Sequence, residues 1–338
     1  MVNNHNVNIL FFADSHLGFD FPVGNRSKRV RRGPDFFRNF RHILDMARHQ
    51  KVDLVIHGGD LFDRSQVHPK IVNRAYDALF AFAESGIPLV IVPGNHDRST
   101  LPTGLFLQHR NLHIFREPAV FRFHIKGHDI NVAGFPFVRN IGREIEHLLR
   151  NFQDQIGSEG TSLLLMHQTV EDVVVGPSNY TFRPGPQVIG LSQLVGSFHA
   201  YLSGHIHPHQ ILWTPTSPPR PIFYPGSIER TSFAECKETK GYLILSIDRQ
   251  EKLQHHFQPL PTRPMYTLQL DIEMVDQKSI IEQITVAPYD ENGVLRIRIP
   301  SPQIAAQFKI QHIRPHLPAK MIIETQHLWI RRDKVKYS

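Results

Sequence analysis

Residues 53–63 read D-L-V-I-H-G-G-D-L-F-D, and residues 88–97 read P-L-V-I-V-P-G-N-H-D. In both stretches a short apolar run is followed by glycine and then by carboxylate, amide or imidazole side chains. A short apolar run bounded by turn residues is typical of a buried strand. In open α/β sheets, functional residues gather beyond the carboxyl ends of parallel strands. The two stretches therefore predict neighbouring strands that present polar side chains at one edge of a sheet.

The segments around these stretches alternate between strand-like and helix-like patterns. We expect strands at 8–13, 53–57 and 88–92, and helices at 35–49 and 69–85. Pro69 stands at the first position of the second helix, where a missing backbone N–H is tolerated. This βαβαβ order predicts parallel strands joined by right-handed crossovers.

Further along the chain short strand-like runs dominate. We expect strands at 121–125, 130–133, 163–166, 200–203, 222–224 and 242–247, with one helix at about 140–152. The Pro- and Ser-rich segment 214–221 is expected to be an exposed loop. Strands on both sides of a core bury their faces against each other. The predicted fold class is therefore mixed α/β, a two-sheet sandwich flanked by helices.

A Pro-containing stretch, 259–264, separates this region from the C-terminal part of the chain. With 338 residues the chain is long enough for a large and a small domain. We expect a first domain at 1–260 and a small α+β domain at 265–338. In the second, strands are predicted at 266–270, 294–299 and 321–324, and helices at 275–285 and 303–313.

The composition is that of a globular protein, with 41% hydrophobic and 20% charged residues. No apolar run approaches the ~20 residues that a membrane-spanning helix needs, and no signal peptide is recognisable. The single cysteine, Cys236, cannot form an internal disulfide and is expected to be a packing residue. These features predict a cytoplasmic protein that does not insert into membranes.

The chain is basic, with a net charge of +7 and a pI near 9.5. This balance favours polyanionic partners. The segment R-S-K-R-V-R-R at 26–32 carries five cations. It either contacts DNA phosphates or is a solvated loop. A second basic cluster is expected to be a solvated chain end: Arg331, Arg332, Lys334 and Lys336.

Seven side chains of metal-ligand type follow the predicted strands. They are Asp14, His16, Asp60, Asn95, His167, His205 and His207. All offer nitrogen or oxygen donors and none offers a thiolate, a set that suits Mn²⁺, Fe or Zn²⁺ at a reactive centre. In D-x-H and H-x-H, alternate residues of an extended segment project the same way. Taken singly, each residue could instead be a hydrogen-bonded loop residue.

The ordered set D-x-H, G-D, G-N-H-D, H and G-H-x-H resembles that of the calcineurin-like metallophosphoesterases. Within that superfamily the chain is similar to the SbcD nucleases, bacterial relatives of the eukaryotic double-strand-break repair nuclease. This similarity lies in F-A-D-S-H-L-G, G-G-D-L-F-D and G-H-I-H, followed by Y-P-G-S-I-E-R-T-S-F-A-E at 224–235 and K-G-Y at 240–242. It covers residues 9–247, and the trailing domain is similar to that family's DNA-capping domain in position and size.

The resemblance implies a role for each motif residue. One metal would be bound by Asp14, His16 and His207, a second by Asn95, His167 and His205, and Asp60 would bridge the two. His96 would be the catalytic residue that faces the scissile phosphate as proton donor or electrostatic stabiliser, and Asp97 would orient it. Asp63, three residues past Asp60, either tunes the site or caps the following turn.

The implied function is a dinuclear, Mn²⁺-dependent DNA exonuclease or endonuclease, with Fe, Zn²⁺ or Mg²⁺ as alternative cofactors. The attacking hydroxide would form from water between the two cations. One alternative is a phosphodiesterase or phosphatase for a small substrate such as a nucleotide. Another is a metal-free protein-interaction scaffold, which we disfavour because none of the seven ligand residues is missing.

The resemblance also implies partners, namely DNA, a coiled-coil ATPase of the SbcC type and a second copy of the chain. Relatives commonly continue into a helical ATPase-binding segment, whereas this sequence ends at Ser338. Phenylalanines near the motifs are expected to pack in the core and have no site role: Phe36, Phe37, Phe40, Phe80 and Phe82. Phe19 and Phe21 are expected to do the same, although stacking on bases is an alternative.

Overall fold

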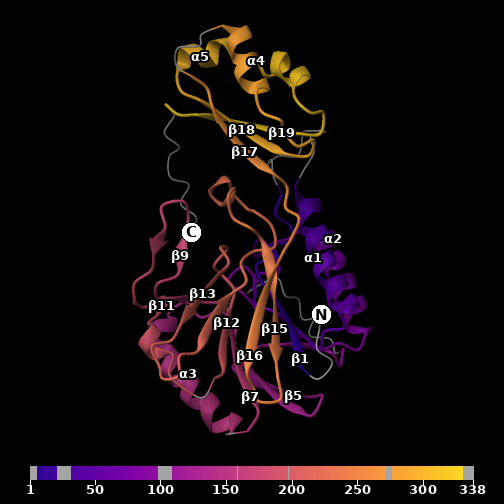
Figure 1. Cartoon of the computed structure of the whole chain (residues 1–338), viewed down its shortest axis with the longest axis vertical. Coiled ribbons are helices and arrows are strands. Elements are labelled where there is room, and N and C mark those ends of the chain that lie inside the picture. The colour runs from indigo at the N-terminus through magenta and orange to yellow at the C-terminus, as the bar shows by residue number, and fades with distance from the viewer. Residues whose placement is uncertain are drawn as a thin grey trace. The chain divides into compact units, whose positions relative to one another are not determined.

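The computed structural model describes residues 6–20, 32–97, 109–157, 159–196, 198–271 and 276–329. The chain divides into two compact units (Figure 1). Among the described residues, the smaller unit comprises Arg32 and the chain from Arg263 onward, and the larger unit comprises the rest. Phe21, residues 26–31 and the cluster from Arg331 to Lys336 lie outside the described residues. Arg32, the last cation of the basic segment, is buried.

The first sheet of the larger unit has six strands in the order β16-β15-β1-β2-β3-β4. These strands are β1 (Val7–Phe12), β2 (Leu54–His57), β3 (Leu89–Ile91), β4 (Leu112–Ile114), β15 (Gly241–Ile247) and β16 (Leu253–Pro259). Strands β1 to β4 run parallel. The helices α1 (Gly33–His49) and α2 (Pro69–Ala83) connect the first three strands. The predicted βαβαβ order is therefore confirmed.

Helices α1 and α2 pack on one face of this sheet (Figure 1). The buried apolar positions of α1 recur at helical spacing: Phe36, Phe37, Phe40, Ile43, Leu44 and Ala47. They share a hydrophobic core with Leu10 and Phe12 of β1 and with Phe82 of α2. Phe80 packs against the same core, so the five helix phenylalanines are packing residues, as predicted.

The second sheet has the order β13-β14-β12-β7-β6-β5. These strands are β5 (Ala119–Ile125), β6 (His128–Gly134), β7 (Thr161–Met166), β12 (Ala200–Ser203), β13 (Gln210–Trp213) and β14 (Pro221–Tyr224). The helix α3 (Ile141–Ile156) covers one face through Ile145, Leu149 and Phe152. The loop before β14 is mostly exposed, although Thr214 is buried.

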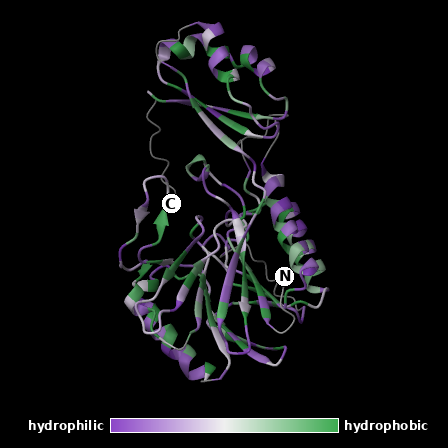
Figure 2. Ribbon diagram, viewed as in Figure 1, coloured by the Kyte–Doolittle hydropathy of each residue, from purple (hydrophilic) through white to green (hydrophobic). Residues whose placement is uncertain are grey.

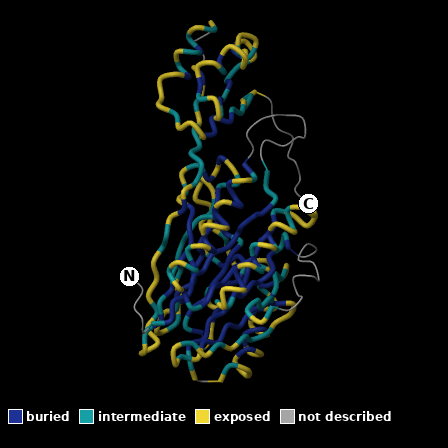
Figure 3. The backbone as a smooth tube through the Cα atoms, turned by 90° about the vertical axis from the view of Figure 1, so that its right-hand side faces the viewer, coloured by how far each residue is buried: buried dark blue, intermediate teal, exposed yellow. Residues whose placement is uncertain are grey.

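The two sheets bury a common core between them. Phe11, Ile56 and Val90 of the first sheet share this core with Leu163 and Phe223 of the second. Figure 3 shows the buried residues concentrated in the interior of the larger unit, and Figure 2 shows hydrophobic residues in many of its strands. Every residue of β1 and of β7 is buried, which explains why these strands are mostly apolar and do not alternate between polar and apolar residues. The predicted two-sheet sandwich flanked by helices is confirmed.

Between β7 and β12 the chain forms two small ladders and a 3-10 turn. Strand β8 (Thr169–Val170) pairs with β11 (Val188–Ile189), and β9 (Val174–Val175) pairs with β10 (Tyr180–Thr181). The turn η1 spans Leu191–Gln193, and a second turn, η2, spans Phe233–Glu235.

The smaller unit has a parallel sheet in the order β17-β18-β19. Its elements are β17 (Met265–Gln269), α4 (Gln277–Thr285), β18 (Val294–Ile299), α5 (Pro302–Gln307), α6 (Ile310–Ile313), η3 (Arg314–His316) and β19 (Ile322–His327). One side of the sheet shares a core with the helices through Leu295, Ile297 and Ile299. The predicted α+β alternation is therefore present.

The single helix predicted at 303–313 is wrong, because the chain is extended at Phe308 and Lys309. At about 100° per residue, an unbroken helix would place Ile304 and Ile313 on opposite sides. The break allows Ile304, Phe308 and Ile313 to contact the same core.

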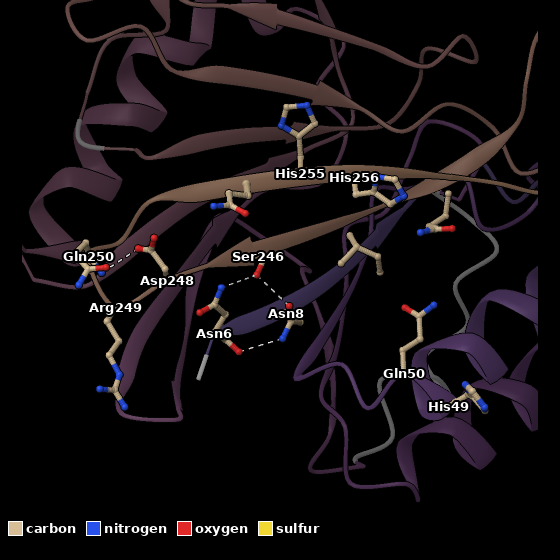
Figure 4. Close-up of a pocket in the computed structure, with 13 residues that line it drawn as sticks. Asn6, Asn8, His49, Gln50, Ser246, Asp248, Arg249, Gln250, His255 and His256 are labelled. Atoms are coloured by element: carbon tan, nitrogen blue, oxygen red, sulfur yellow. Dashed lines mark hydrogen bonds between the residues drawn. The ribbon is translucent and has the colours of Figure 1, made fainter. Parts of the chain in front are cut away.

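A wide pocket of about 1010 Å³ lies on the larger unit, lined mainly by amide and imidazole side chains of β1, β15, β16 and the end of α1. Figure 4 shows Asn6, Asn8 and Ser246 linked by hydrogen bonds in its wall. None of the seven candidate ligands lines this pocket. Within the described part of the chain, no helix has both the length and the apolar composition to span a bilayer.

Candidate metal centre

The candidate ligands lie just beyond the carboxyl ends of parallel strands in both sheets. Asp14 and His16 follow β1, Asp60 follows β2, and Asn95 follows β3. From the second sheet, His167 directly follows β7, and His205 and His207 follow β12. Each ligand lies within five residues of the last residue of its strand. Because the sheets are packed face to face, loops far apart in sequence meet at one end of the sandwich.

The backbone at this end is strained where ligands occur. Asp14, His16, Asp60 and His205 have φ angles of 52°, 42°, 52° and 82°. A positive φ is uncommon for residues with a Cβ and costs about 1–3 kcal/mol where the surrounding structure imposes it. Such strain concentrates at functional sites, which supports the assignment of this end as the reactive one.

Two glycines allow the loops to approach. A Cβ on Gly94 would overlap the Asp60 carboxylate and backbone nitrogen, and a Cβ on Gly59 would overlap Nδ1 of His167. Gly59 also has a φ of 98°. Space therefore requires glycine at both positions, and at Gly59 the backbone conformation requires it as well.

Asp14, His16 and His207 form the first group, with potential ligand atoms within 4.8 Å of one another. The Nε2 atoms of His16 and His207 are 3.0 Å apart. The Asp14 carboxylate accepts hydrogen bonds from the backbone N–H of His205, at 3.1 and 3.0 Å for its two oxygens. All three residues come from the loops after β1 and β12.

Asp60, His167 and His205 form the second group, within the same 4.8 Å limit. His167 Nδ1 donates to the Gly58 carbonyl at 2.7 Å, which turns Nε2 toward Asp60 Oδ2 at 3.3 Å. Asn95 Oδ1 lies 3.2 Å from His167 Nε2 and 3.0 Å from His205 Nδ1. All seven predicted ligands thus converge in two adjacent sets.

Burial and mutual charge shift the pKa values of these groups. Burial lowers the pKa of His16 and of His205 to about 3, so both are neutral near pH 7 and have a free lone pair. Burial also lowers the pKa of His167, but the Asp60 carboxylate outweighs it and the pKa stands at about 9. For Asp60, burial raises the pKa, whereas the charge of His167 holds it well below its usual value. Burial raises the pKa of Asp14 to about 6.

The arrangement fits divalent cations. The groups hold carboxylates, an amide oxygen and imidazole nitrogens, and no thiolate. Among the described residues, the Nδ1 atom of buried His16 has no hydrogen-bond partner, and Asp63 Oδ1 lies 3.7 Å from it. Histidines that bind a metal through one ring nitrogen commonly have a carboxylate beside the other. Asp63 therefore faces the site, which favours tuning over the turn-cap alternative.

His96 lies beside both groups and is more open than they are. Its side chain is 40% exposed, compared with 5% for His16 and 0% for His167. Its backbone N–H donates to Asp60 Oδ1 at 3.0 Å, and its Nε2 is 3.8 Å from Asp60 Oδ2. The ring can therefore reach a molecule that enters the centre.

Asp97 is buried and anchors loops. Its carboxylate accepts hydrogen bonds from the backbone N–H groups of Leu61, Phe62 and Gly94, each at 3.0 Å. These bonds tie the loop after β2 to the loop after β3. The Asp97 carboxylate binds backbone N–H groups and not the His96 ring. Its role is therefore to anchor the two loops, and not to orient His96 as predicted.

Sequence reasoning missed two supporting contacts. Buried His57, at the end of β2, has Nε2 2.9 Å from the Ser15 hydroxyl, and burial lowers its pKa to about 3. Glu235 Oε1 lies 3.2 Å from His207 Nδ1, and Lys240 pairs with Glu235 at 2.8 Å. Glu235 and Lys240 fall in the F-A-E and K-G-Y motifs, for which the sequence alone suggested no role.

The other singled-out residues take no part in the two groups. Phe19 packs on Phe36, with ring centroids 4.8 Å apart, so core packing is supported over base stacking. Cys236 is half-buried, with its thiol free.

Comparison with known proteins supports the same assignment. A profile of the calcineurin-like phosphoesterase family matches residues 7–209. The chain is 25% identical to the DNA double-strand break repair protein Mre11 of Archaeoglobus fulgidus, over 86% of this chain and 67% of the relative. It is also 25% identical to the SbcD component of the SbcCD nuclease of Staphylococcus epidermidis, over 80% of this chain and 75% of the relative.

The chain spans 49% to 67% of the length of four archaeal relatives named Mre11. Among solved structures, a dimetal phosphatase from Danio rerio matches with a TM-score of 0.50 and 12% identity, over 75% of this chain and 96% of that one. This likeness concerns the fold alone. Because the family match covers more than half of the chain and includes all seven candidate ligands, the chain belongs to the calcineurin-like phosphoesterase family, as the sequence resemblance predicted.

Proposed function

We propose that this chain is a DNA nuclease of the SbcD type that hydrolyses phosphodiester bonds with two divalent cations. The observation that carries the proposal is the convergence of two groups of three ligand-type side chains in a phosphoesterase fold. Relatives named as a DNA repair protein and as a nuclease component match over 86% and 80% of this chain, which supports DNA as the substrate.

The proposed ligands fall into two sets, Asp14, His16 and His207 for one cation and Asn95, His167 and His205 for the other, with Asp60 shared. The sharing is supported by electrostatics, because the Asp60 charge acts on a histidine of each group: burial lowers the pKa of His16 and the Asp60 charge opposes this, whereas for His167 the Asp60 charge outweighs burial and raises the pKa. When bound, two divalent cations activate water and neutralise charge on phosphoryl oxygens. We propose Mn²⁺ as the native metal, with Fe, Zn²⁺ and Mg²⁺ as alternatives.

His96 is the proposed catalytic residue. Its exposed ring next to Asp60 can protonate the leaving oxygen or stabilise negative charge on the phosphate. The hydrogen bond from its backbone N–H to Asp60 Oδ1 fixes the start of the side chain relative to the shared carboxylate. Preorganised groups of this kind stabilise transition states because they need no reorganisation during the reaction.

Partners and domain roles belong to the same proposal. The net charge of +7 supports a polyanionic substrate. We propose that residues 1–260 form the nuclease domain and that 265–338 form a DNA-capping domain. We also propose a homodimer that binds an SbcC-type ATPase, by analogy with the Mre11 and SbcCD relatives.

Hydrolysis of a small phosphodiester is the competing function, because the same centre could perform it. The test compares end-labelled single- and double-stranded DNA with bis-p-nitrophenyl phosphate, in Mn²⁺, between about 50 and 200 mM salt. We expect DNA cleavage that falls steeply with salt and small-substrate hydrolysis that changes little. Hydrolysis of the small substrate alone would overturn the nuclease proposal, and purified protein that binds no metal would favour the scaffold.

A further inference from the structure

The His207 ring is held from behind by a carboxylate. Its Nδ1 lies 3.2 Å from Glu235 Oε1, while its Nε2 lies 3.0 Å from His16 Nε2 in the first group. A carboxylate on Nδ1 fixes the tautomer and leaves Nε2 with its lone pair toward the group. Glu235 therefore determines which nitrogen His207 presents.

Glu235 is itself fixed on several sides. The Thr231 hydroxyl donates to Oε1 at 2.5 Å, and the Thr231 backbone N–H donates to Oε2 at 3.2 Å. The Lys240 ammonium lies 2.8 Å from Oε2. Glu235 has a side chain that is only 9% exposed. Because a buried carboxylate is stable only when it is paired, these contacts keep it charged and immobile.

Lys240 connects the carboxylate to the backbone of the same histidine. Its side chain is fully buried, and Nζ donates to the His207 carbonyl at 3.1 Å and to Glu238 Oε2 at 2.6 Å. With Glu235 as the third acceptor, all three ammonium protons are used. Glu235 thus contacts the His207 ring, and Lys240 contacts its main-chain carbonyl.

The second group has no equivalent among its described contacts. His167 Nδ1 donates to the neutral Gly58 carbonyl, and His205 turns Nδ1 toward Asn95. We propose that Glu235 and Lys240 are positioning residues that set the metal affinity of the Asp14, His16 and His207 group separately from that of the second group. This inference rests on the proposed two-metal centre and extends it to residues outside the ligand set.

The competing explanation is that the buried ion pairs only stabilise the fold. Buried pairs are weak evidence of stability by themselves, because desolvation offsets their attraction. A structural role would lower stability and affect both metal groups alike. A positioning role would weaken one group selectively, and this difference is measurable without any activity assay.

The test titrates the purified full chain with Mn²⁺ by calorimetry, together with metal analysis after dialysis. The variant Glu235→Gln keeps the size of the side chain but removes its charge. Glu238→Gln is the matched control, because Glu238 pairs with Lys240 at 2.6 Å and has no described contact with the His207 ring. Thr231→Val is a second variant, which removes the hydroxyl that donates to Glu235 at 2.5 Å and lies 3.5 Å from His207 Nδ1, without changing charge.

We expect wild type and Glu238→Gln each to bind two Mn²⁺, and each of the two affinities to be similar in the two proteins. In Glu235→Gln one of the two affinities falls about 10- to 100-fold and the other stays within about 3-fold, and Thr231→Val changes the same affinity by a smaller factor. The inference is overturned if both affinities remain at wild-type values, if both fall equally, or if Glu238→Gln loses as much. Wild-type protein that binds no Mn²⁺ would instead overturn the metal centre itself, and this inference with it.

Discussion

The side chain of His96 is more exposed than those of two proposed histidine ligands. Its exposed fraction is 40%, compared with 25% for His207 and 5% for His16. Burial favours metal binding by a ligand, because water then cannot compete for the metal. A proton donor, in contrast, must be accessible to its substrate. The exposure gradient therefore separates the proposed catalytic residue from the proposed ligands.

Replacing His96 with glutamine should keep the metals and abolish most turnover. The backbone N–H bond to Asp60 remains, but the ring that can donate a proton is lost, and such a loss costs about 10²- to 10⁴-fold. Single-turnover cleavage of labelled DNA at saturating Mn²⁺, with metal analysis of the same sample, measures both quantities. Cleavage by His96→Gln at the wild-type rate would show that the assignment is wrong.

Asp60 should behave in the opposite way, since its charge acts on both groups. We expect Asp60→Ala to weaken Mn²⁺ binding by more than about 100-fold, beyond the loss typical of an outer contact. Asp60→Asn is the matched variant, because an amide oxygen can still accept from the His96 N–H while the charge is gone. Calorimetry that finds two tightly bound Mn²⁺ in Asp60→Ala would contradict the shared-ligand scheme.

At the scale of elements, the site is formed by the loops that follow the strands, and close contacts between these loops fix their positions. The loop after β3 passes so near the loop after β2 that Gly94 lies against Asp60, and Asp97 ties the two together through backbone N–H groups. Side-chain volume at this crossing should therefore affect both folding and metal binding.

Gly94→Ala tests this crossing. Its Cβ would overlap the Asp60 carboxylate, so we expect a loss of about 1–3 kcal/mol in the free energy of unfolding together with weaker Mn²⁺ binding. Gly185→Ala serves as control, because nothing lies within 4 Å of its added Cβ. Urea unfolding and Mn²⁺ titration report the two effects. Equal behaviour of the two variants would refute the close-contact argument.

Elements differ in how well they could be predicted. The central strands β1, β2, β3 and β7 are buried at every position and mostly apolar, and the sequence predicts them because both faces are covered. The sequence does not predict β4, β13 and β16, which lie at sheet edges, or the two-residue strands β8 to β11. Strand β16 reads L-Q-H-H-F-Q-P, with several exposed polar residues. Its conformation depends on seven register pairs with β15, which local pattern does not reveal.

At the scale of the whole molecule, the proposed metal centre joins the two sheets of the larger unit. Ligands for each proposed cation come from the first sheet and from the second, as with His16 and His207, which are 191 positions apart. A bound cation therefore crosslinks segments that are distant in sequence, and its binding energy adds to folding stability.

Removal of metal should consequently lower the melting temperature. Binding at about 100 times Kd contributes about 2.7 kcal/mol, which corresponds to several degrees in Tm for a chain of this size. Thermal unfolding in Mn²⁺ and after chelation measures the shift, and Asp60→Ala should show little of it. An unchanged wild-type Tm would argue against a centre that joins the sheets.

The sequence by itself determined which ligand-type residues lie at the ends of strands, because each motif is local and directly follows the strand that precedes it. Tertiary structure alone decided which side chains share a group, that Asp97 anchors backbone, and that Glu235 and Lys240 hold His207. It also decided that the helix expected at 303–313 breaks at Phe308. These outcomes depend on contacts between residues far apart in the chain or on the shape of a core, and neither is encoded in local spacing.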